Sequence, residues 1–473
     1  MLTQGGDVFH TSATPWLALA ELHRHTQGEL AHMEVEAAEF RERLRAEYES
    51  SAPDSGSIAA GLDSADLNAL VESVNPSSDL LDDDENAPVI RLLNALLAEA
   101  IRQNASDIHL EPFETRVSVR FRVDGALHES LEVASALAPL LASRIKVMAK
   151  LDIAEKRLPQ DGRIALQLGG RSVDVRVSTL PGNNGERVVM RLLDKSAERL
   201  RLGALGMDEA LREAWRERLA LPHGVLLVTG PTGSGKTTTL YASLLHIRDG
   251  RKNLLTIEDP IEYDLDGIGQ TQVSAKTGLT FAKGLRAMLR QDPDVVMVGE
   301  IRDRETAEIA VQASLTGHLV LSTLHTNSSA GAVTRLIDMG VERFLLASSL
   351  AGVLAQRLVR VLCTECKVLG EAEPAVLEQL GWPGGSGELP RVYRAAGCDA
   401  CRHGYAGRTA MYEFLPVTEP VAKLIYEGAS EAELSEHAVG AERSLAADGL
   451  RLVLAGVTSL EELLRVALGR AQS

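Results

Sequence analysis

The sequence predicts an α/β fold built on a parallel β-sheet, preceded by a smaller α+β domain. Two patterns carry this prediction. After residue 221, short apolar runs alternate with helical segments, which is typical of strands that are buried on both faces. Between residues 87 and 193, a helical apolar repeat precedes strands that alternate apolar and polar residues, which is typical of antiparallel sheets. The four apolar runs are residues 225–228, 254–257, 295–298 and 319–321.

The composition is that of an ordinary globular protein. Of the 473 residues, 45% are hydrophobic and 24% are charged, and a chain of this length predicts about three domains. The formal net charge of −17 disfavours a protein that binds nucleic acid non-specifically. The longest tempting apolar stretch, residues 344–356, is shorter than the roughly 18 residues of a membrane span. Because no basic-then-apolar leader opens the chain, we expect a cytoplasmic protein.

The α+β domain is expected to begin near Ala87. Its strands include residues 117–123, with arginines on the polar face, and 188–193, together with a hairpin around Gly169 and Gly170. Residues 15–50 have a helical pattern, and the Ser-, Asp- and Pro-rich segments after them indicate a linker. The expected divisions are 1–49 (helical docking segment), 50–86 (acidic linker), 87–215 (α+β domain), 216–362 (parallel-sheet core), 363–402 (tetracysteine subdomain) and 403–473 (C-terminal helical region).

A phosphate-binding loop is predicted within the core. Residues 230–237 match the P-loop pattern without a mismatch, between an apolar strand and a helical segment. Its glycines allow backbone N–H groups to converge on phosphate oxygens, and the helix N-terminus favours their negative charge. Lys236 is expected to reach the β- and γ-phosphates, and Thr237 to ligate Mg²⁺. The expected nucleotide contacts are Gly230, Pro231, Thr232, Gly233, Ser234, Gly235, Lys236, Thr237 and Thr238.

Acids and histidines follow the other strands of the predicted sheet. Glu258 and Glu262 follow the second strand, Glu300 ends the third like a Walker B acid, and His318 and His325 flank the fourth. Since ligands collect at the carboxyl ends of parallel strands, these side chains are expected to surround one site. The plainer alternatives are Glu258 or Asp259 as a turn cap, Glu300 as a structural partner of Arg302, and each histidine as a core residue.

The cysteines predict a metal centre. All four fall in two CxxC pairs, Cys363 with Cys366 and Cys398 with Cys401. Two such pairs supply four thiolates for a tetrahedral Zn²⁺ site, which leaves no open position for catalytic water. A redox or metal-free role is the alternative, and a cytoplasmic setting argues against disulfides.

Taken together, these motifs resemble those of the secretion traffic ATPases. The segment from Gly230 to Asn327 is similar to their Walker A, aspartate-box, Walker B and histidine-box motifs, and the likeness extends from Ala87 to Ser473. Residues 104–109 and 185–195 most resemble the type II secretion ATPases (general secretion pathway protein E). The type IV pilus assembly (extension) ATPases are the alternative. The resemblance implies a RecA-like P-loop core after a PAS-like α+β domain, with a zinc-binding insertion and a helical C-terminal part.

The resemblance also implies a function and its partners. Such proteins are homohexamers that hydrolyse ATP on the cytoplasmic face of a bacterial inner membrane, to power pseudopilus assembly and protein export. They attach peripherally through a bitopic assembly protein and a polytopic platform protein. Type II members generally carry a longer N-terminal docking domain than residues 1–86 would form, and here residues 15–48 are expected to dock.

Roles for individual residues follow from the same resemblance. Glu262 would orient the attacking water, Glu300 would act near Mg²⁺, and His325 would report the γ-phosphate to a moving domain. Arg176 and Arg191, from the α+β domain, would approach the phosphates and neutralise developing charge. Surface salt bridges are the alternative for both arginines.

Other functions of a P-loop protein stay open. A nucleotide-gated scaffold would bind ATP without turnover, which Glu262 and Glu300 disfavour. A nucleic-acid motor of related fold is disfavoured by the net charge and by the lack of a basic, aromatic-rich face. A kinase is least favoured, because nothing in the sequence resembles an acceptor site.

Overall fold

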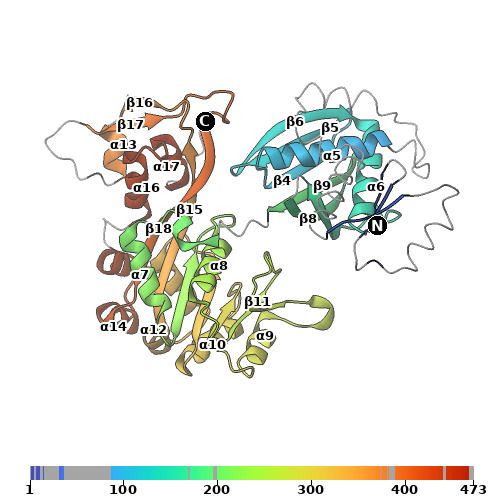
Figure 1. Cartoon of the computed structure of the whole chain (residues 1–473). Coiled ribbons are helices and arrows are strands. Elements are labelled where there is room, and N and C mark those ends of the chain that lie inside the picture. Colours follow the sequence, from blue (N-terminus) through green and yellow to red (C-terminus); the bar gives the residue numbers. More distant parts are fainter. Residues whose placement is uncertain are drawn as a thin grey trace. The chain divides into compact units, whose positions relative to one another are not determined.

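The computed structural model describes most of the chain (Figure 1). The described residues are 2–4, 7–10, 14, 31–36, 87–168, 171–194, 200–372, 374–380, 382, 389–439 and 444–467. The chain divides into two compact units, Met1–Lys195 and Ser196–Ser473. Within the described ranges, no helix combines the length and the apolar character that a bilayer crossing requires.

The first unit contains an antiparallel sheet of six strands, in the order β6-β5-β4-β9-β8-β7. The apolar face of the sheet and two helices share one core. The predicted hairpin is confirmed, because Leu168 of β7 pairs with Arg171 of β8. The elements are α5 Ala87–Arg102, β4 Asp107–Pro112, β5 Arg116–Val123, β6 Ala126–Ala134, the 3₁₀ helix η1 Ser135–Leu137, α6 Ala138–Met148, β7 Gln160–Leu168, β8 Arg171–Gly182 and β9 Gly185–Asp194.

Alternation along β5 separates the two faces of this sheet. Val119 and Phe121 are buried in the core, whereas Arg120 and Arg122 take the alternate positions and face the other way. Strand β4 places acids on that polar face, and Glu111 forms ion pairs with Arg120 and Arg187. The predicted arginine-bearing face is therefore confirmed, and part of its positive charge is neutralised within the unit.

Three short strands lie near the start of the chain. Leu2–Gln4 (β1) pairs antiparallel with Asp7–His10 (β2), which pairs in parallel with Ala31–Glu34 (β3). Residues 31–34 fall within the stretch 15–50 that is predicted as a helix or helix pair, and for these four residues the helical prediction is wrong. Pairing with β2 overrides the local helical pattern, because it supplies hydrogen-bond partners from another strand. Residues 35 and 36 are described and form neither helix nor strand, and the other residues of the predicted helix and linker lie outside the described residues.

The second unit is built on a seven-stranded sheet, in the order β12-β11-β13-β14-β10-β15-β18. Neighbouring strands run parallel, except that β15 and β18 are antiparallel. Alternate residues of β10 enter different cores: Val225 and Leu227 pack with α9 to α11, and Leu226 and Val228 with α8. The predicted parallel sheet with both faces covered is therefore confirmed.

The elements of the second unit are the 3₁₀ helix η3 Leu202–Ala204, α7 Glu209–Leu219, β10 Gly224–Thr229, α8 Lys236–Ile247, β11 Leu254–Glu258, β12 Gly269–Gln272, the 3₁₀ helix η4 Ala275–Thr277, α9 Phe281–Met288, β13 Val295–Val298, α10 Arg304–Leu315, β14 Leu319–Leu324, α11 Ser329–Asp338, α12 Arg343–Ser349, β15 Leu350–Leu362, β16 Val368–Glu371, α13 Pro374–Gln379, β17 Arg391–Arg394, β18 Tyr405–Pro416, α14 Glu419–Glu427, α15 Glu431–Leu434, the π-helix η5 Ser435–Val439, α16 Leu445–Leu454 and α17 Leu460–Ala467.

Residues 200–215 belong to the second unit, although the sequence-based division places them in the first. The reason is Trp215 of α7, which is fully buried. Its indole N–H donates to the Ser243 hydroxyl of α8 at 3.0 Å, and its ring meets Phe414 of β18 edge to face. Burying so large an aromatic side chain fixes α7 to the parallel-sheet core.

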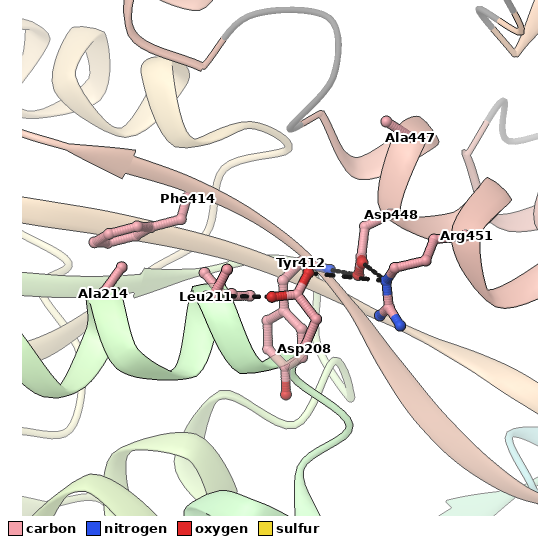
Figure 2. Close-up of a pocket in the computed structure, with 9 residues that line it drawn as sticks. Asp208, Leu211, Ala214, Tyr412, Phe414, Ala447, Asp448 and Arg451 are labelled. Carbon is pink, nitrogen blue, oxygen red and sulfur yellow. Dashed lines mark hydrogen bonds and ion pairs between the residues drawn. The ribbon is translucent and has the colours of Figure 1, made fainter.

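A cavity of about 240 Å³ lies between α7, β18 and α16 (Figure 2). Asp208 caps α7 by accepting from the Leu211 backbone N–H at 2.7 Å. Asp448 of α16 accepts from the Tyr412 N–H at 2.8 Å and from Arg451 Nε at 2.7 Å. The polar groups at the cavity therefore join α16 to β18 and cap α7.

The C-terminal region differs from its sequence-based description in one respect. Residues 405–416, expected within a helical region, form β18, the edge strand of the main sheet. This segment pairs with β15, and the helical periodicity of the region does not predict such a strand pairing. The described residues after it are largely helical, from α14 to α17.

A buried carboxylate ties α17 to β15. The side chain of Glu462 is fully buried and accepts hydrogen bonds from Arg360 Nη2 at 2.7 Å and Arg465 Nη2 at 2.6 Å. Burial alone would raise the pKa of Glu462, but the bonds from Arg465 and Arg360 outweigh it and hold the pKa below its ordinary value. This carboxylate therefore stabilises the fold in its ionised form.

Replacing Glu462 with Gln is expected to destabilise the second unit by about 3 kcal/mol, because it removes the buried carboxylate that Arg360 and Arg465 share and leaves the partly buried Arg360 charge uncompensated. Urea unfolding checks this value. The neighbouring Glu461→Gln variant, at a half-exposed position, serves as the control and should change the unfolding free energy by less than about 0.5 kcal/mol. The stabilisation by Glu462 should also fade as the pH falls through its lowered pKa, and equal effects of both variants would contradict this account.

Candidate nucleotide site and metal centre

The phosphate loop connects β10 to α8, as its pattern predicts. Strand β10 ends at Thr229 and α8 begins at Lys236. Gly233 and Gly235 have φ angles of +79° and +86°, a left-handed conformation that side chains with a Cβ disfavour. The rim of the loop is exposed, as is Thr237 in the first turn of the helix. Backbone N–H groups and a hydroxyl are thus available to an anion and its metal ion.

Lys236 lies against the inside of this loop. Its ammonium group donates to the carbonyl oxygens of Gly230 at 2.8 Å and Pro231 at 3.0 Å. Burial lowers the pKa of Lys236 to about 8, and the charge of Glu300 opposes that shift. A positive charge held in a mostly buried position beside converging N–H groups is suited to bind polyphosphate.

The Walker B acid and the histidine box lie together. Glu300 follows β13, and its carboxylate lies 2.5 Å from Arg302 Nη2 and 3.5 Å from His325 Nε2. The expected contact with the histidine box and the alternative pairing with Arg302 therefore coexist. Glu300 is largely buried, whereas His325 is half exposed.

The two aspartate-box glutamates differ in their surroundings. Glu258 is buried, and its carboxylate accepts from Thr256 Oγ1 at 2.6 Å, from Gln270 Nε2 at 3.0 Å and from the Tyr241 hydroxyl. Glu262 is partly exposed, and its backbone N–H donates to the Tyr241 oxygen at 3.1 Å. Glu258 therefore acts as an internal anchor, and Glu262 is the less buried of the two, although its Oε2 atom is buried.

Tyr241 is a site residue that the sequence analysis misses. It lies on α8, fully buried, and joins the two glutamates of the aspartate box. Burial and the charge of Glu258 raise the pKa of Tyr241, so its hydroxyl keeps its proton at any working pH. The sequence offered one signal for this role: Tyr241 lies in the helical segment after Lys236, and a tyrosine that is buried there needs a hydrogen-bond partner.

His318 does not join this group. It precedes β14, at the amino end of the strand, whereas the site forms at the carboxyl ends. Its Nδ1 lies 2.9 Å from the Ala313 carbonyl oxygen and 3.2 Å from Thr316 Oγ1. The expectation that it lines the site is therefore wrong, because the strand separates it from His325 by its whole length.

Arg176 and Arg191 lie on the polar face of the first unit. They are direct cross-strand partners on β8 and β9. Arg191 Nε donates to Asp107 Oδ1 at 2.9 Å, and its side chain is 60% exposed. The two strands therefore present a pair of neighbouring guanidinium groups, and the approach of these groups to phosphate stays a prediction.

The four cysteines gather in one cluster. The Sγ–Sγ distances are 3.9 Å for Cys363–Cys398, 3.6 Å for Cys366–Cys401 and 3.7 Å for Cys398–Cys401. Thiolates around a tetrahedral Zn²⁺, with Zn–S bonds of about 2.3 Å, lie about 3.8 Å apart, whereas a disulfide requires about 2.05 Å. The backbone N–H groups of Gly397 and Cys398 donate to Cys366 and Cys401 at 3.3 Å. The donor set and its spacing thus fit zinc.

The fold and the loop define a RecA-like P-loop protein, and comparisons place it more narrowly. The family model described as type II/IV secretion system protein matches residues 82–465. The type II secretion system protein E of Pseudomonas aeruginosa is 59% identical over 95% of this chain and 89% of its own length. The type II secretion system ATPase E of Vibrio cholerae is 53% identical over 97% and 92%. The chain therefore belongs to the type II/IV secretion system proteins, within the group of type II secretion ATPases.

Solved structures show the same fold. The crystal structure of the pilus retraction motor PilT with bound ADP matches 78% of this chain and 95% of that one, with a TM-score of 0.53 and 26% identity. The ATPase DotB of Legionella pneumophila matches 80% and 96%, with a TM-score of 0.59 and 22% identity. The RecA-like core and the α+β domain before it are thus the architecture of known secretion and pilus ATPases.

Replacing Tyr241 with Phe is expected to lower the free energy of unfolding by about 1–3 kcal/mol, because buried Glu258 loses one donor and the Glu262 N–H loses its acceptor. Denaturant unfolding gives this value. Tyr426→Phe, at an exposed position on α14, is the control and should leave stability unchanged. A Tyr241 variant as stable as the parent would show that the hydroxyl does not bridge the two glutamates.

Proposed function

We propose that this protein is a homohexameric ATPase that hydrolyses ATP to power pseudopilus assembly and protein export in a bacterial type II secretion system. The carrying observation is the phosphate loop with Lys236 inside it, in electrostatic reach of Glu300, which pairs with His325. A scaffold that only binds nucleotide does not need two acids, Glu262 and Glu300, after neighbouring strands of the sheet. The identity of more than half to relatives named for type II secretion supports the biological setting.

Binding of ATP is assigned to the loop and the first turn of α8. The N–H groups of residues 232–237 would cradle the phosphates, and Lys236 would exchange its contacts with the loop carbonyls for phosphate oxygens. Thr237 is exposed at the helix start and would hold Mg²⁺, with Glu300 close by. When bound, Mg²⁺ neutralises charge on the β- and γ-phosphates.

The hydrolytic step is assigned to Glu262. Glu262 would orient the water whose oxygen attacks the γ-phosphorus as the bond to ADP breaks, and would take up the proton released. Glu258 is unsuited to this role because its oxygen atoms accept internal hydrogen bonds. His325 would sense the γ-phosphate, since its ring lies half exposed beside Glu300.

Arg176 and Arg191 would supply the remaining positive charge. Their position as cross-strand neighbours brings two guanidinium groups to one patch of the first unit. Closure of the two units around nucleotide would then neutralise charge that develops on the transferred phosphoryl group. Such an arrangement couples hydrolysis to domain motion.

Structural Zn²⁺ is assigned to the tetracysteine cluster. Cys363 directly follows β15, and Cys401 lies shortly before β18, so the metal would clamp the ends of two paired strands of the main sheet. The ion would supply folding energy, with no open position for a catalytic role.

The setting is the cytoplasmic face of the inner membrane. Peripheral attachment would run through the bitopic assembly protein and the polytopic platform protein of the secretion system, with residues 1–49 as the docking segment. Type IV pilus extension is the second candidate function, and the likeness to a pilus retraction motor supports only a fold in common with pilus motors. The names and higher identity of the type II relatives favour export. Nothing in the charge pattern favours a nucleic-acid partner.

Hydrolysis is tested by phosphate release from three variants. Glu262→Gln and Glu300→Gln are expected to release phosphate about 10²–10⁴-fold more slowly than the parent while still binding ATP, because each loses an acid of the reaction. Lys236→Ala should lose nucleotide binding itself. Glu305→Gln, an exposed acid at the start of α10, is the control. Unchanged phosphate release from both acid variants would replace the motor with a nucleotide-gated scaffold.

Zinc is tested by metal analysis of the purified full chain. One zinc ion per chain is expected, and Cys398→Ser should reduce its retention during dialysis against a chelator. Loss of the ion should lower the melting temperature, since structural zinc contributes on the order of 10 kcal/mol to folding. Asp399→Ser, between the two cysteines of the same pair, should retain the metal. A metal-free parent with full stability would favour the redox alternative.

A further inference from the structure

Strand β15 runs beneath the phosphate loop and extends past the end of β10. Its pairing with β10 ends at Thr229 opposite Ala355. The next residue, Gln356, therefore lies where the loop begins, and a Cβ on Gly230 would come within 2.4 Å of the Gln356 carbonyl oxygen. Gln356 is 1% exposed. Gln356 belongs to none of the sequence motifs described above.

Both ends of the Gln356 amide are hydrogen-bonded to parts of the nucleotide site. Its Nε2 donates to the carbonyl oxygen of Ser234 in the loop at 2.6 Å. Its Oε1 accepts from the hydroxyl of Thr239 in the first turn of α8 at 2.8 Å. Because the Ser234 carbonyl can only accept, the amide has one possible orientation. One side chain thus joins the phosphate loop and the helix that follows it.

The bond to Ser234 also sets the direction of a backbone N–H group. The Ser234 carbonyl and the Gly235 N–H belong to the same planar, trans peptide, so they point in opposite directions. Holding the carbonyl against β15 turns the Gly235 N–H away from the sheet, toward the side on which a P-loop receives phosphate. With the peptide in this orientation, Gly235 has a φ angle of +86°, in the left-handed region.

A buried amide is unfavourable at this position unless its hydrogen bonds offset the cost of desolvation. Its neighbours on the strand, Leu354 and Leu358, pack in an apolar core, and an apolar side chain of similar length would avoid the cost of desolvating a polar group. The two hydrogen bonds offset that cost only in the arrangement seen, in which loop and helix are both correctly placed.

We infer that Gln356 is a positioning residue, which orients the Gly235 N–H for phosphate and holds the loop against α8. This inference rests on the proposed nucleotide site. It predicts that loss of the amide weakens the binding of nucleotide phosphates, in addition to the cost in stability of leaving two buried groups unpaired. It also predicts that kcat changes less than KM while ATP binding equilibrates faster than it is hydrolysed.

The test compares the full-length parent with Gln356→Met, which keeps the length of the side chain and removes both hydrogen bonds. Titration with a fluorescent ADP analogue in Mg²⁺ should give a Kd about tenfold higher for the variant, the size expected from one well-formed hydrogen bond to a charged ligand site. Steady-state ATP hydrolysis should show the change mainly in KM. Ser243→Ala is the matched control, because it removes two buried hydrogen bonds of the same helix, one from Trp215 and one to the Thr239 carbonyl oxygen, and neither of them reaches the loop. It should lower the melting temperature and leave Kd unchanged.

A second variant, Gln356→Glu, adds a pH signature. Its ionised carboxylate would face the Ser234 carbonyl without a donor, whereas its protonated form would donate in place of the amide. Nucleotide affinity of this variant should therefore recover as the pH falls from 8 to 6, relative to the parent at each pH, because burial raises the pKa of a carboxyl group. A general loss of structure would give no such recovery.

The outcomes separate the inference from the proposed function. If the parent binds and hydrolyses ATP while Gln356→Met binds it equally well, or Gln356→Glu shows no recovery relative to the parent, the positioning role is overturned and the ATPase stands. If the parent itself binds no nucleotide, the proposed function fails first. A tenfold weaker Kd for Gln356→Met, beside an unchanged Kd for the destabilised Ser243→Ala control, supports the positioning role.

Discussion

The parallel register of β10, β11, β13 and β14 is the constraint on which the site depends. Parallel strands deliver their following residues to one edge of the sheet, and here that edge receives the phosphate loop, the aspartate box, Glu300 and His325. A direct tie holds this edge together, because the hydroxyl groups of Thr229 and Thr326 lie 2.7 Å apart where β10 and β14 end. Segments from nearly a hundred residues of sequence thereby become one site.

Beneath that edge, buried polar groups orient the aspartate box and the phosphate loop. Glu258 and Tyr241 hold the aspartate box, and Gln356 holds the phosphate loop. Each of these groups is buried, and each would cost folding energy without its partners. Their arrangement leaves Thr237 and the rim of the loop exposed and Glu262 partly exposed. Buried groups with satisfied hydrogen bonds thus hold the site in place, and the more exposed groups remain available to nucleotide and water.

Strand β15 links this site to the metal centre. It pairs with β10 beside the loop, reaches Arg360 with its buried partner Glu462, and ends one residue before Cys363. Strand β18 pairs with it along most of its length. A metal ion at the cysteines would therefore stabilise the same two strands that support the phosphate loop. The polar face of the first unit, where Asp107 neutralises Arg191, is the remaining charged surface of mechanistic interest.

Local sequence was sufficient for the features whose chemistry is local. The P-loop pattern, the buried strands, the Walker B acid and the paired cysteines each lie within a few neighbouring residues, so their spacing alone predicted them. Tertiary structure decided what depends on distant partners. Only packing shows that Glu258 is an anchor while Glu262 is partly exposed, that His318 lies at the wrong end of β14, and that residues 405–416 are a sheet edge. Hydrogen bonds between residues that are far apart in the chain produce no periodic pattern in the sequence. For that reason the sequence predicted which residue types take part, and only the fold showed where each of them lies.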